Sequence, residues 1–263
     1  MTDTTPLDTA HAAMTAAPDD DAARLRFYER LADSELFLLL TQEAEGDNIN
    51  PETFDVADGS FVLAFDRQNR LAQFADRPAP YAAMSGRVIA RLLAGQGMGL
   101  GLNLNVAVSS ILIPDTAVDW LNQTLGHAPD EVEAKITAFN PPKGLPEALL
   151  TALDTKLTTA TGLATSAYLV GVEYDSGAQG HLLGFVDTVE GAQGALAQAV
   201  NEALTFSGIE AGALDVGFFA NTDPVSAKLA KSGLRFDLPK PPEHPPSQPI
   251  APGSDPAKPP MLK

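Results

Sequence analysis

The sequence contains no cysteine. Disulfides, thiolate metal sites, thiol nucleophiles and iron–sulfur clusters are therefore excluded, because each needs cysteine sulfur. Basic residues are also scarce: 17 lysines and arginines stand against 34 aspartates and glutamates, which gives a formal net charge of −17. Such a surface repels phosphate backbones and anionic lipids, so we expect neither a nucleic-acid partner nor a membrane partner.

Long hydrophobic runs are absent too. No run of about 18 apolar residues, the length that spans a bilayer, occurs in the chain. Residues 1–22 lack the basic start and the apolar block of a secretory signal. The hydrophobic share is nevertheless 44%, which is sufficient for a packed core. We therefore predict a soluble cytoplasmic protein.

The two ends of the chain differ from the rest in composition. Residues 1–22 are mainly Thr, Ala and Asp, and we predict that they are disordered. Ten of the 25 residues from Pro239 to Lys263 are proline, which cannot continue a helix or pair inside a sheet. We predict a disordered proline-rich tail over 239–263; the alternative is a ligand for a proline-reading groove.

Between these ends, apolar periodicity predicts an α+β protein of two lobes, 23–126 and 146–238, joined by a linker at 127–145 that is rich in glycine and proline. Neither lobe shows the regular strand–helix alternation of a doubly wound fold. We expect helices at 23–33, 86–94, 114–125, 146–160, 192–207 and 224–231. We expect strands at 35–40, 61–65, 70–74, 99–105, 166–174, 181–186, 214–220 and 234–238, and a loop at 41–58.

Four glycines at alternate positions, Gly95, Gly97, Gly99 and Gly101, invite comparison with nucleotide-binding loops. The dinucleotide fingerprint needs the spacing G-x-G-x-x-G between a strand and a helix, and a phosphate loop ends in Gly-Lys-Ser/Thr. Neither pattern is present. We interpret the glycines as a helix end followed by a strand against which something packs closely.

Signatures of catalysis or metal binding are equally scarce. No serine stands in a G-x-S-x-G elbow, and none of the four histidines neighbours a plausible nucleophile. The acidic segment 43–50 has a calcium-loop composition but lacks the glycine and the glutamate that such a loop requires, so we expect a solvated loop. We therefore expect no enzymatic activity, no metal and no cofactor.

Three residues are the candidates for binding. Asn103 and Asn105 stand at the end of a predicted strand, where their amides could both donate to and accept from a ligand; turn formation is the alternative role. Trp120, the only tryptophan, stands at the margin of an apolar helix face. An exposed tryptophan would mark an interaction surface, and a buried one would belong to the core.

The order of the apolar segments resembles the N-terminal domain of the SseB family, which is named for an enhanced serine-sensitivity phenotype. The residues that carry the resemblance are ELFLLL (35–40), GSFVLAFD (59–66), RLAQFA (70–75), SGRVIARLLAG (85–95), GLGLNLN (99–105) and PDTAVDWLNQTL (114–125). The segments LPEALLTALDTKL (145–157), AYLVGVEYD (167–175) and ALDVGFFA (213–220) resemble the family's C-terminal domain. An unrelated type III translocon protein shares the name, and nothing is transferred from it.

The resemblance implies no catalytic residue and no cofactor. Our leading hypothesis is therefore a non-catalytic interaction or regulatory protein with a protein partner. The alternative is a regulator that binds a small molecule, such as an amino acid, in a pocket between the lobes. An unrecognised hydrolase is a third hypothesis, which would need convergent polar groups in a cleft.

Overall fold

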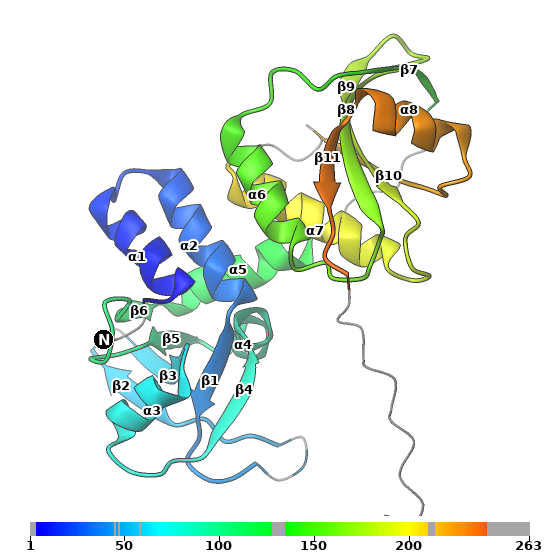
Figure 1. Cartoon of the computed structure of the whole chain (residues 1–263). Helices are drawn as coiled ribbons and strands as arrows, with labels where there is room; N and C mark the ends of the chain where they lie inside the picture. The colour runs from blue at the N-terminus through cyan, green and yellow to red at the C-terminus, as the bar shows by residue number, and fades with distance from the viewer. Residues whose placement is uncertain are drawn as a thin grey trace, which may run out of the picture.

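The structure, a computed structural model, describes residues 4–44, 46, 48–57, 59–127, 135–209 and 214–240. Predictions for the tail from residue 241, and for Glu45 and Asp47 of the acidic segment, lie outside these residues. Two lobes lie side by side, and each contains a mixed sheet (Figure 1). The first lobe turns α2 (Asp21–Asp33), α4 (Gly86–Leu93) and α5 (Asp115–Gly126) toward α6 (Glu147–Leu157) and α7 (Gln193–Phe206) of the second. The α+β fold class is thus confirmed.

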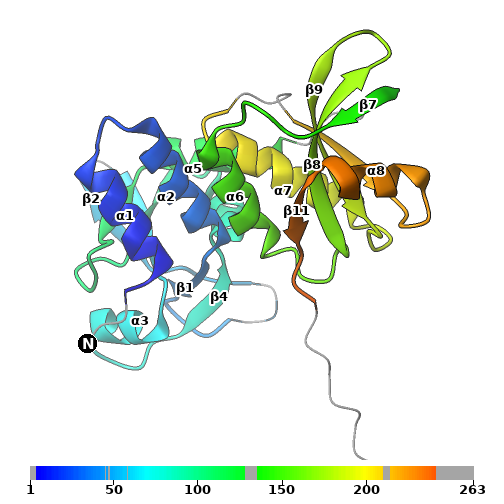
Figure 2. The ribbon, with the colours of Figure 1, turned by 45° about the horizontal axis from the view of Figure 1, so that its top comes forward.

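The described residues of the first lobe form one mixed sheet with strand order β4-β1-β3-β5-β6, in which β2 also pairs with β3. α1, α2, α4 and α5 cover one face of this sheet, and α3 covers part of the other (Figure 2). The elements are α1 (Pro6–Ala16), α2 (Asp21–Asp33), β1 (Glu35–Leu39), β2 (Thr53–Val56), β3 (Gly59–Phe65), α3 (Gln68–Ala75), β4 (Tyr81–Ser85), α4 (Gly86–Leu93), β5 (Met98–Leu102), β6 (Ile111–Ile113) and α5 (Asp115–Gly126).

The described residues of the second lobe form a sheet with strand order β10-β9-β8-β11, in which β7 also pairs with β8. α6 and α7 pack on one face of the sheet and α8 on the other. The elements are β7 (Ile136–Asn140), α6 (Glu147–Leu157), β8 (Ser166–Tyr174), β9 (Gln179–Val186), α7 (Gln193–Phe206), β10 (Asp215–Phe219), α8 (Pro224–Ser232) and β11 (Leu234–Asp237).

The expected disorder at the N-terminus is wrong for residues 6–16, which form α1. Thr5 caps this helix: its hydroxyl accepts a hydrogen bond from the backbone N–H of Asp8, whose carboxylate in turn accepts from the backbone N–H of Thr5. Leu7 is buried in the core of the first lobe. One apolar side chain and one capping box thus order a segment whose composition resembles a disordered one.

Residues 70–74, expected to be a strand, lie in the helix α3. Leu71 and Phe74 are three residues apart, so they share one face of a helix, and both pack against the sheet. The short run Arg70–Phe74 fits a strand as well as a helix when it is judged by period alone. Tertiary packing therefore selected the helix.

Strands occur in two segments that were expected to lack them. β2 lies in the expected loop at 41–58 and places Phe54 opposite Phe61 of β3. β7 lies in the expected linker at 127–145 and pairs with β8, so part of that segment belongs to the second sheet. Both are short edge strands of four or five residues; β2 pairs with the neighbouring β3 and β7 with the more distant β8, and short edge strands carry little local pattern.

The strand expected at 99–105 ends earlier, at Leu102, because Asn103 and Asn105 adopt positive φ angles of 48° and 58°.

The interpretation of the four glycines is confirmed. Gly95 and Gly97 form a turn with positive φ after α4, and a Cβ added at Gly99 would lie 2.5 Å from the Phe61 ring and from the Ile113 carbonyl oxygen.

Within the described ranges, no helix is both long enough and apolar enough to cross a membrane.

Candidate functional site

A buried polar network lies beneath the first turn of α1. The carboxylate of Asp8 accepts hydrogen bonds from Arg70 at 3.0 Å and from the Ser109 hydroxyl at 2.6 Å. Burial alone would raise the pKa of Asp8, but these bonds and the Arg70 charge hold it well below its usual range. The network therefore keeps Asp8 ionised and ties α1 to α3 and to the loop after β5.

Arg70 also pairs with Asp66, at 2.8 Å, and Thr5 donates its hydroxyl to the same carboxylate at 2.7 Å. The backbone N–H of Asp66 donates to the amide oxygen of Asn103, while the Asn103 amide nitrogen donates to Ser109. Asn103 is fully buried, so its amide serves the turn after β5.

Asn103 and Asn105, the two residues predicted to bind a ligand, lie in different surroundings. Asn105 is exposed, and its backbone N–H donates to the Ser110 hydroxyl at 3.2 Å. Neither Asn103 nor Asn105 lines the two pockets described below. The prediction that they bind a ligand stays untested, and the turn that they form is the role that the structure shows.

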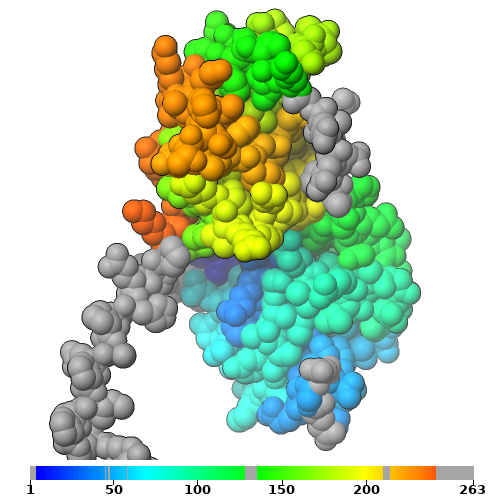
Figure 3. Space-filling model, turned by 90° about the vertical axis from the view of Figure 1, so that its right-hand side faces the viewer, coloured from blue at the N-terminus to red at the C-terminus, as the bar shows by residue number. Residues whose placement is uncertain are grey.

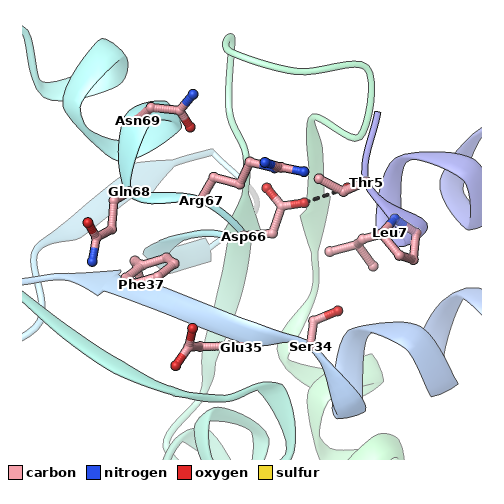
Figure 4. A pocket seen from close by; sticks show the side chains of 10 residues that line it. Thr5, Leu7, Ser34, Glu35, Phe37, Asp66, Arg67, Gln68 and Asn69 are labelled. Carbon is pink, nitrogen blue, oxygen red and sulfur yellow. Dashed lines mark hydrogen bonds between the residues drawn. The ribbon is translucent and has the colours of Figure 1, made fainter. Parts of the chain in front are cut away.

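The first pocket opens beside this network and has a volume of about 550 Å³ (Figure 4). Figure 4 shows the Asp66 carboxylate bonded to Thr5 and lying close to Arg67. The Arg67 Nε atom is buried and has no hydrogen-bond partner among the described residues. The pocket is lined by Thr5, Pro6, Leu7, Ser34, Glu35, Phe37, Asp66, Arg67, Gln68 and Asn69.

The contact between the two lobes has an apolar part built around Trp120. This side chain is 37% exposed and meets Tyr28 of α2 and Phe206 of α7 edge-to-face, at centroid distances of 5.2 and 6.4 Å. Phe206 belongs to the second lobe in sequence but is buried in the core of the first. The predicted interaction residue Trp120 therefore lies at the contact between the lobes; whether it also meets another protein is untested.

The polar part of the contact is a cluster of ion pairs, the interlobe cluster, formed by Glu29, Asp33, Arg87, Lys156 and Glu202. Lys156 of α6 is only 4% exposed, and its Nζ lies 2.7 Å from Asp33 of α2 and 2.7 Å from Glu202 of α7. Arg87 of α4 pairs with the same two carboxylates. Two cations thus clamp carboxylates from both lobes, and the space-filling view of Figure 3 shows the two lobes in contact.

Glu29 is the weakly paired member of the interlobe cluster. Its carboxylate is 3.9 Å from Lys156 Nζ, and burial raises its pKa although the Lys156 and Arg30 charges oppose that shift. Glu202 differs: burial would raise its pKa, but bonds from Arg87 and the Lys156 charge lower it. The cluster therefore contains one carboxylate, Glu202, whose ion pairs favour the ionised form, and one, Glu29, whose burial favours the neutral form.

A second pocket, the interlobe cleft, lies between α2 and α6 beside the end of α7 and has a volume of about 360 Å³. Glu29 reaches it from the interlobe cluster, and Phe206 contributes apolar surface. Its full lining is Arg26, Glu29, Arg30, Glu147, Ala148, Thr151, Ala152, Thr155, Phe206 and Ser207.

An apolar strip crosses the face of the first sheet that carries α3; its two ends are exposed, and Phe61 in its middle is 5% exposed. Strand register places Phe54, Phe61 and Gly99 in one row and Gly101 beside Leu112 in the next, all on the same face. Phe54 and Leu112 are 43% and 40% exposed. The strip therefore runs over four strands, about 14 Å at the usual strand spacing.

Sequence reasoning missed the interlobe cluster and the Asp8–Arg70 network. A signal existed for Lys156: it stands seven residues after Leu149 and three after Leu153, which places a charge in the buried stripe of α6. Within the described part of the chain, no group of three or more His, Asp or Glu side chains is placed to hold a metal ion.

Comparison with known proteins concerns the first lobe. Residues 9–120 match the family model described as the SseB protein N-terminal domain. No curated protein and no solved structure matches the chain. The match begins inside α1, in agreement with the burial of that helix in the core of the first lobe, and ends within α5. Residues 9–120, which make up most of the first lobe, are therefore an SseB N-terminal domain.

Proposed function

We propose that this protein is a non-catalytic interaction protein of the SseB family in the cytoplasm, and that its partner docks on the apolar strip of the first lobe. The exposed Phe54 and Leu112 side chains are the observation that carries the proposal. Two large exposed apolar side chains on one sheet face, with the buried Phe61 between them, form the kind of surface that protein partners cover.

Charge identifies the kind of partner. The chain has a net charge of −17, and Glu52 stands two residues before Phe54, directly before β2, on the same side of the strand by alternation. A partner that presents apolar side chains framed by lysine or arginine would match both features. Asp8, Asp66 and Glu202 have cation partners that stabilise the fold, which supports a structural role for these three carboxylates.

The test is affinity capture from an extract of the native cells with three forms of the full chain: wild type, the double variant Phe54→Glu/Leu112→Glu, and Val189→Glu. Val189 is an exposed apolar residue of the second lobe and serves as the matched control. We expect a stoichiometric basic protein with wild type and Val189→Glu that is lost with the double variant. Equal capture by all three forms, or turnover of a substrate by the purified protein, would contradict the proposal.

A chain that ends at Leu238 separates the strip from the proline-rich segment. Retention of the partner by this shorter chain is expected if the strip is the docking surface. Loss of the partner on truncation would move the interaction to residues 239–263.

The second candidate function, a regulator that binds a small molecule, is favoured by one observation: both lobes line the interlobe cleft. A ligand there would change the contact between the lobes and would raise the stability of the folded chain. Thermal unfolding against a panel of amino acids, amines, organic acids and nucleotides tests it. A flat response would count against it.

A further inference from the structure

We propose that the interlobe cleft binds a small primary ammonium ion, with the Glu29 carboxylate as its anchor; this rests on the second candidate function. Glu29 is 4% exposed and lines the cleft, and the ion pair that its carboxylate makes among the described residues is a long one, at 3.9 Å from Lys156 Nζ. A buried carboxylate without hydrogen bonds is costly, and a charged N–H donor that enters the cleft would supply them.

Lys156 does not meet this need. Its Nζ lies 2.7 Å from Asp33 and from Glu202 but 3.9 Å from Glu29, which is beyond hydrogen-bond distance. Arg87 is likewise engaged by Asp33 and Glu202. The lone pairs of Glu29 therefore remain available on the side of the cleft.

Two further polar groups of the cleft are also acceptors. The Thr155 hydroxyl donates its hydrogen to the Thr151 carbonyl oxygen at 2.8 Å, and the Ser207 hydroxyl donates to the Ala203 carbonyl oxygen at 2.6 Å. Their oxygen lone pairs are left for a ligand. Ser207 is also the C-cap of α7, whose C-terminal end carries partial negative charge. Three acceptors from three helices thus favour a cationic donor.

The rest of the lining limits the shape of the ligand. Ala148, Ala152 and Phe206 offer apolar surface beside Glu29, which suits a short alkyl chain. Arg26 and Arg30 also line the cleft, and the Arg30 charge favours the ionised form of Glu29, the form that binds an ammonium group. A volume of about 360 Å³ holds a small molecule only.

The experiment is an NMR titration of the full chain with n-butylammonium chloride, observed at the amides of Thr151, Thr155 and Ser207. Tetramethylammonium chloride has the same charge without an N–H donor, and 1-butanol has the same chain without the charge. We expect saturable shifts with butylammonium alone. Equal shifts with either control compound, or no saturation, would overturn the proposal.

Three variants localise the site. Glu29→Gln is expected to weaken butylammonium binding at least tenfold, and Ala152→Phe, which fills the cleft, is expected to abolish it. Glu190→Gln, an exposed change outside the cleft, should bind as wild type. Undiminished binding by a folded Glu29→Gln protein would overturn the proposal. If butylammonium fails while another compound of the thermal panel binds in the cleft, the ligand class is wrong and the second candidate function stands.

Discussion

Glu29 and Asp8 are both buried carboxylates, yet their surroundings act in opposite directions. Asp8 accepts bonds from Arg70, Ser109 and the Thr5 backbone, which favour its ionised form. Burial dominates at Glu29, which has one cation at 3.9 Å, and favours the neutral form. The two side chains should therefore affect stability oppositely as pH changes.

We predict that Glu29→Gln stabilises the protein at pH 7. The pKa of Glu29 is raised on folding, so its contribution to stability is present at low pH and is lost as pH rises through the folded pKa. A neutral isostere removes that loss, and the gain should be on the order of 1 kcal/mol at pH 7 and near zero at pH 4. Urea unfolding at the two pH values measures it. A lower stability of Glu29→Gln at pH 7 would refute the prediction.

Asp8→Asn is predicted to destabilise the protein. The pKa of Asp8 is lowered on folding, so its contribution is present above the unfolded pKa and is lost as pH falls through the folded pKa. The variant leaves Arg70 with Asp66 alone, and we expect a loss of about 2–3 kcal/mol at pH 7 that shrinks in acid. Chemical unfolding of Asp8→Asn against the exposed control Asp19→Asn checks both the sign and the pH dependence.

At the scale of elements, the close approach of α4 to α2 depends on a glycine. The backbone N–H of Gly86, the first residue of α4, donates to the Ser34 carbonyl oxygen. A Cβ at Gly86 would lie 1.9 Å from the Leu31 carbonyl oxygen, which is rigid helix backbone. No rotamer relieves such an overlap, so one of the two helices would have to move.

Gly86→Ala should therefore destabilise the first lobe by about 3 kcal/mol or more. Gly126 at the end of α5 is the matched control, because no atom lies within 4 Å of an added Cβ there. Gly126→Ala should be neutral or slightly stabilising. Thermal unfolding of the two variants tests the contrast, and similar melting temperatures would show that α4 can shift without cost.

At the scale of the whole molecule, the contact between the lobes is built from Phe206, Trp120 and the interlobe cluster. Phe206 crosses from α7 into the core of the first lobe, so a side chain of the second lobe is part of the first lobe's core. Lys156 bridges Asp33 and Glu202, one from each lobe. These contacts should couple the unfolding of the lobes.

Lys156→Gln tests this coupling. Without the ammonium group, Asp33 and Glu202 share Arg87 alone and Glu29 loses its ion pair, and we expect a loss of about 3 kcal/mol. We also expect calorimetry to resolve two transitions in place of one, because the lobes would unfold separately. Lys143→Gln, at an exposed position, is the control. A single unshifted transition in Lys156→Gln would show that the interlobe cluster does not link the lobes.

The α+β class, most helices and the central strands could be predicted from the sequence, because each shows its own period of apolar residues. The stripe of α6, with Leu149, Leu153 and Leu157, is one example; β8, whose sides are both covered, is another. The segments that were wrong or missed are short or lie at sheet edges: α1, β2, α3, β4, β6 and β7. Their conformations depend on packing and strand pairing with other elements, which the period of a short segment does not reveal.

The sequence by itself determined the absence of cysteine chemistry, the acidic charge and the family of the first lobe. Only the tertiary structure decided which charges are buried and which are paired. Asp8 and Arg70 are 62 residues apart, and Arg87 and Glu202 are 115 apart, so no local pattern joins them. The same holds for Phe54 and Leu112, which share a face only through the pairing of four strands. Sites built from such pairs form only when the chain folds, because electrostatic and apolar contacts depend on the distance between side chains in space and not on their separation in the sequence.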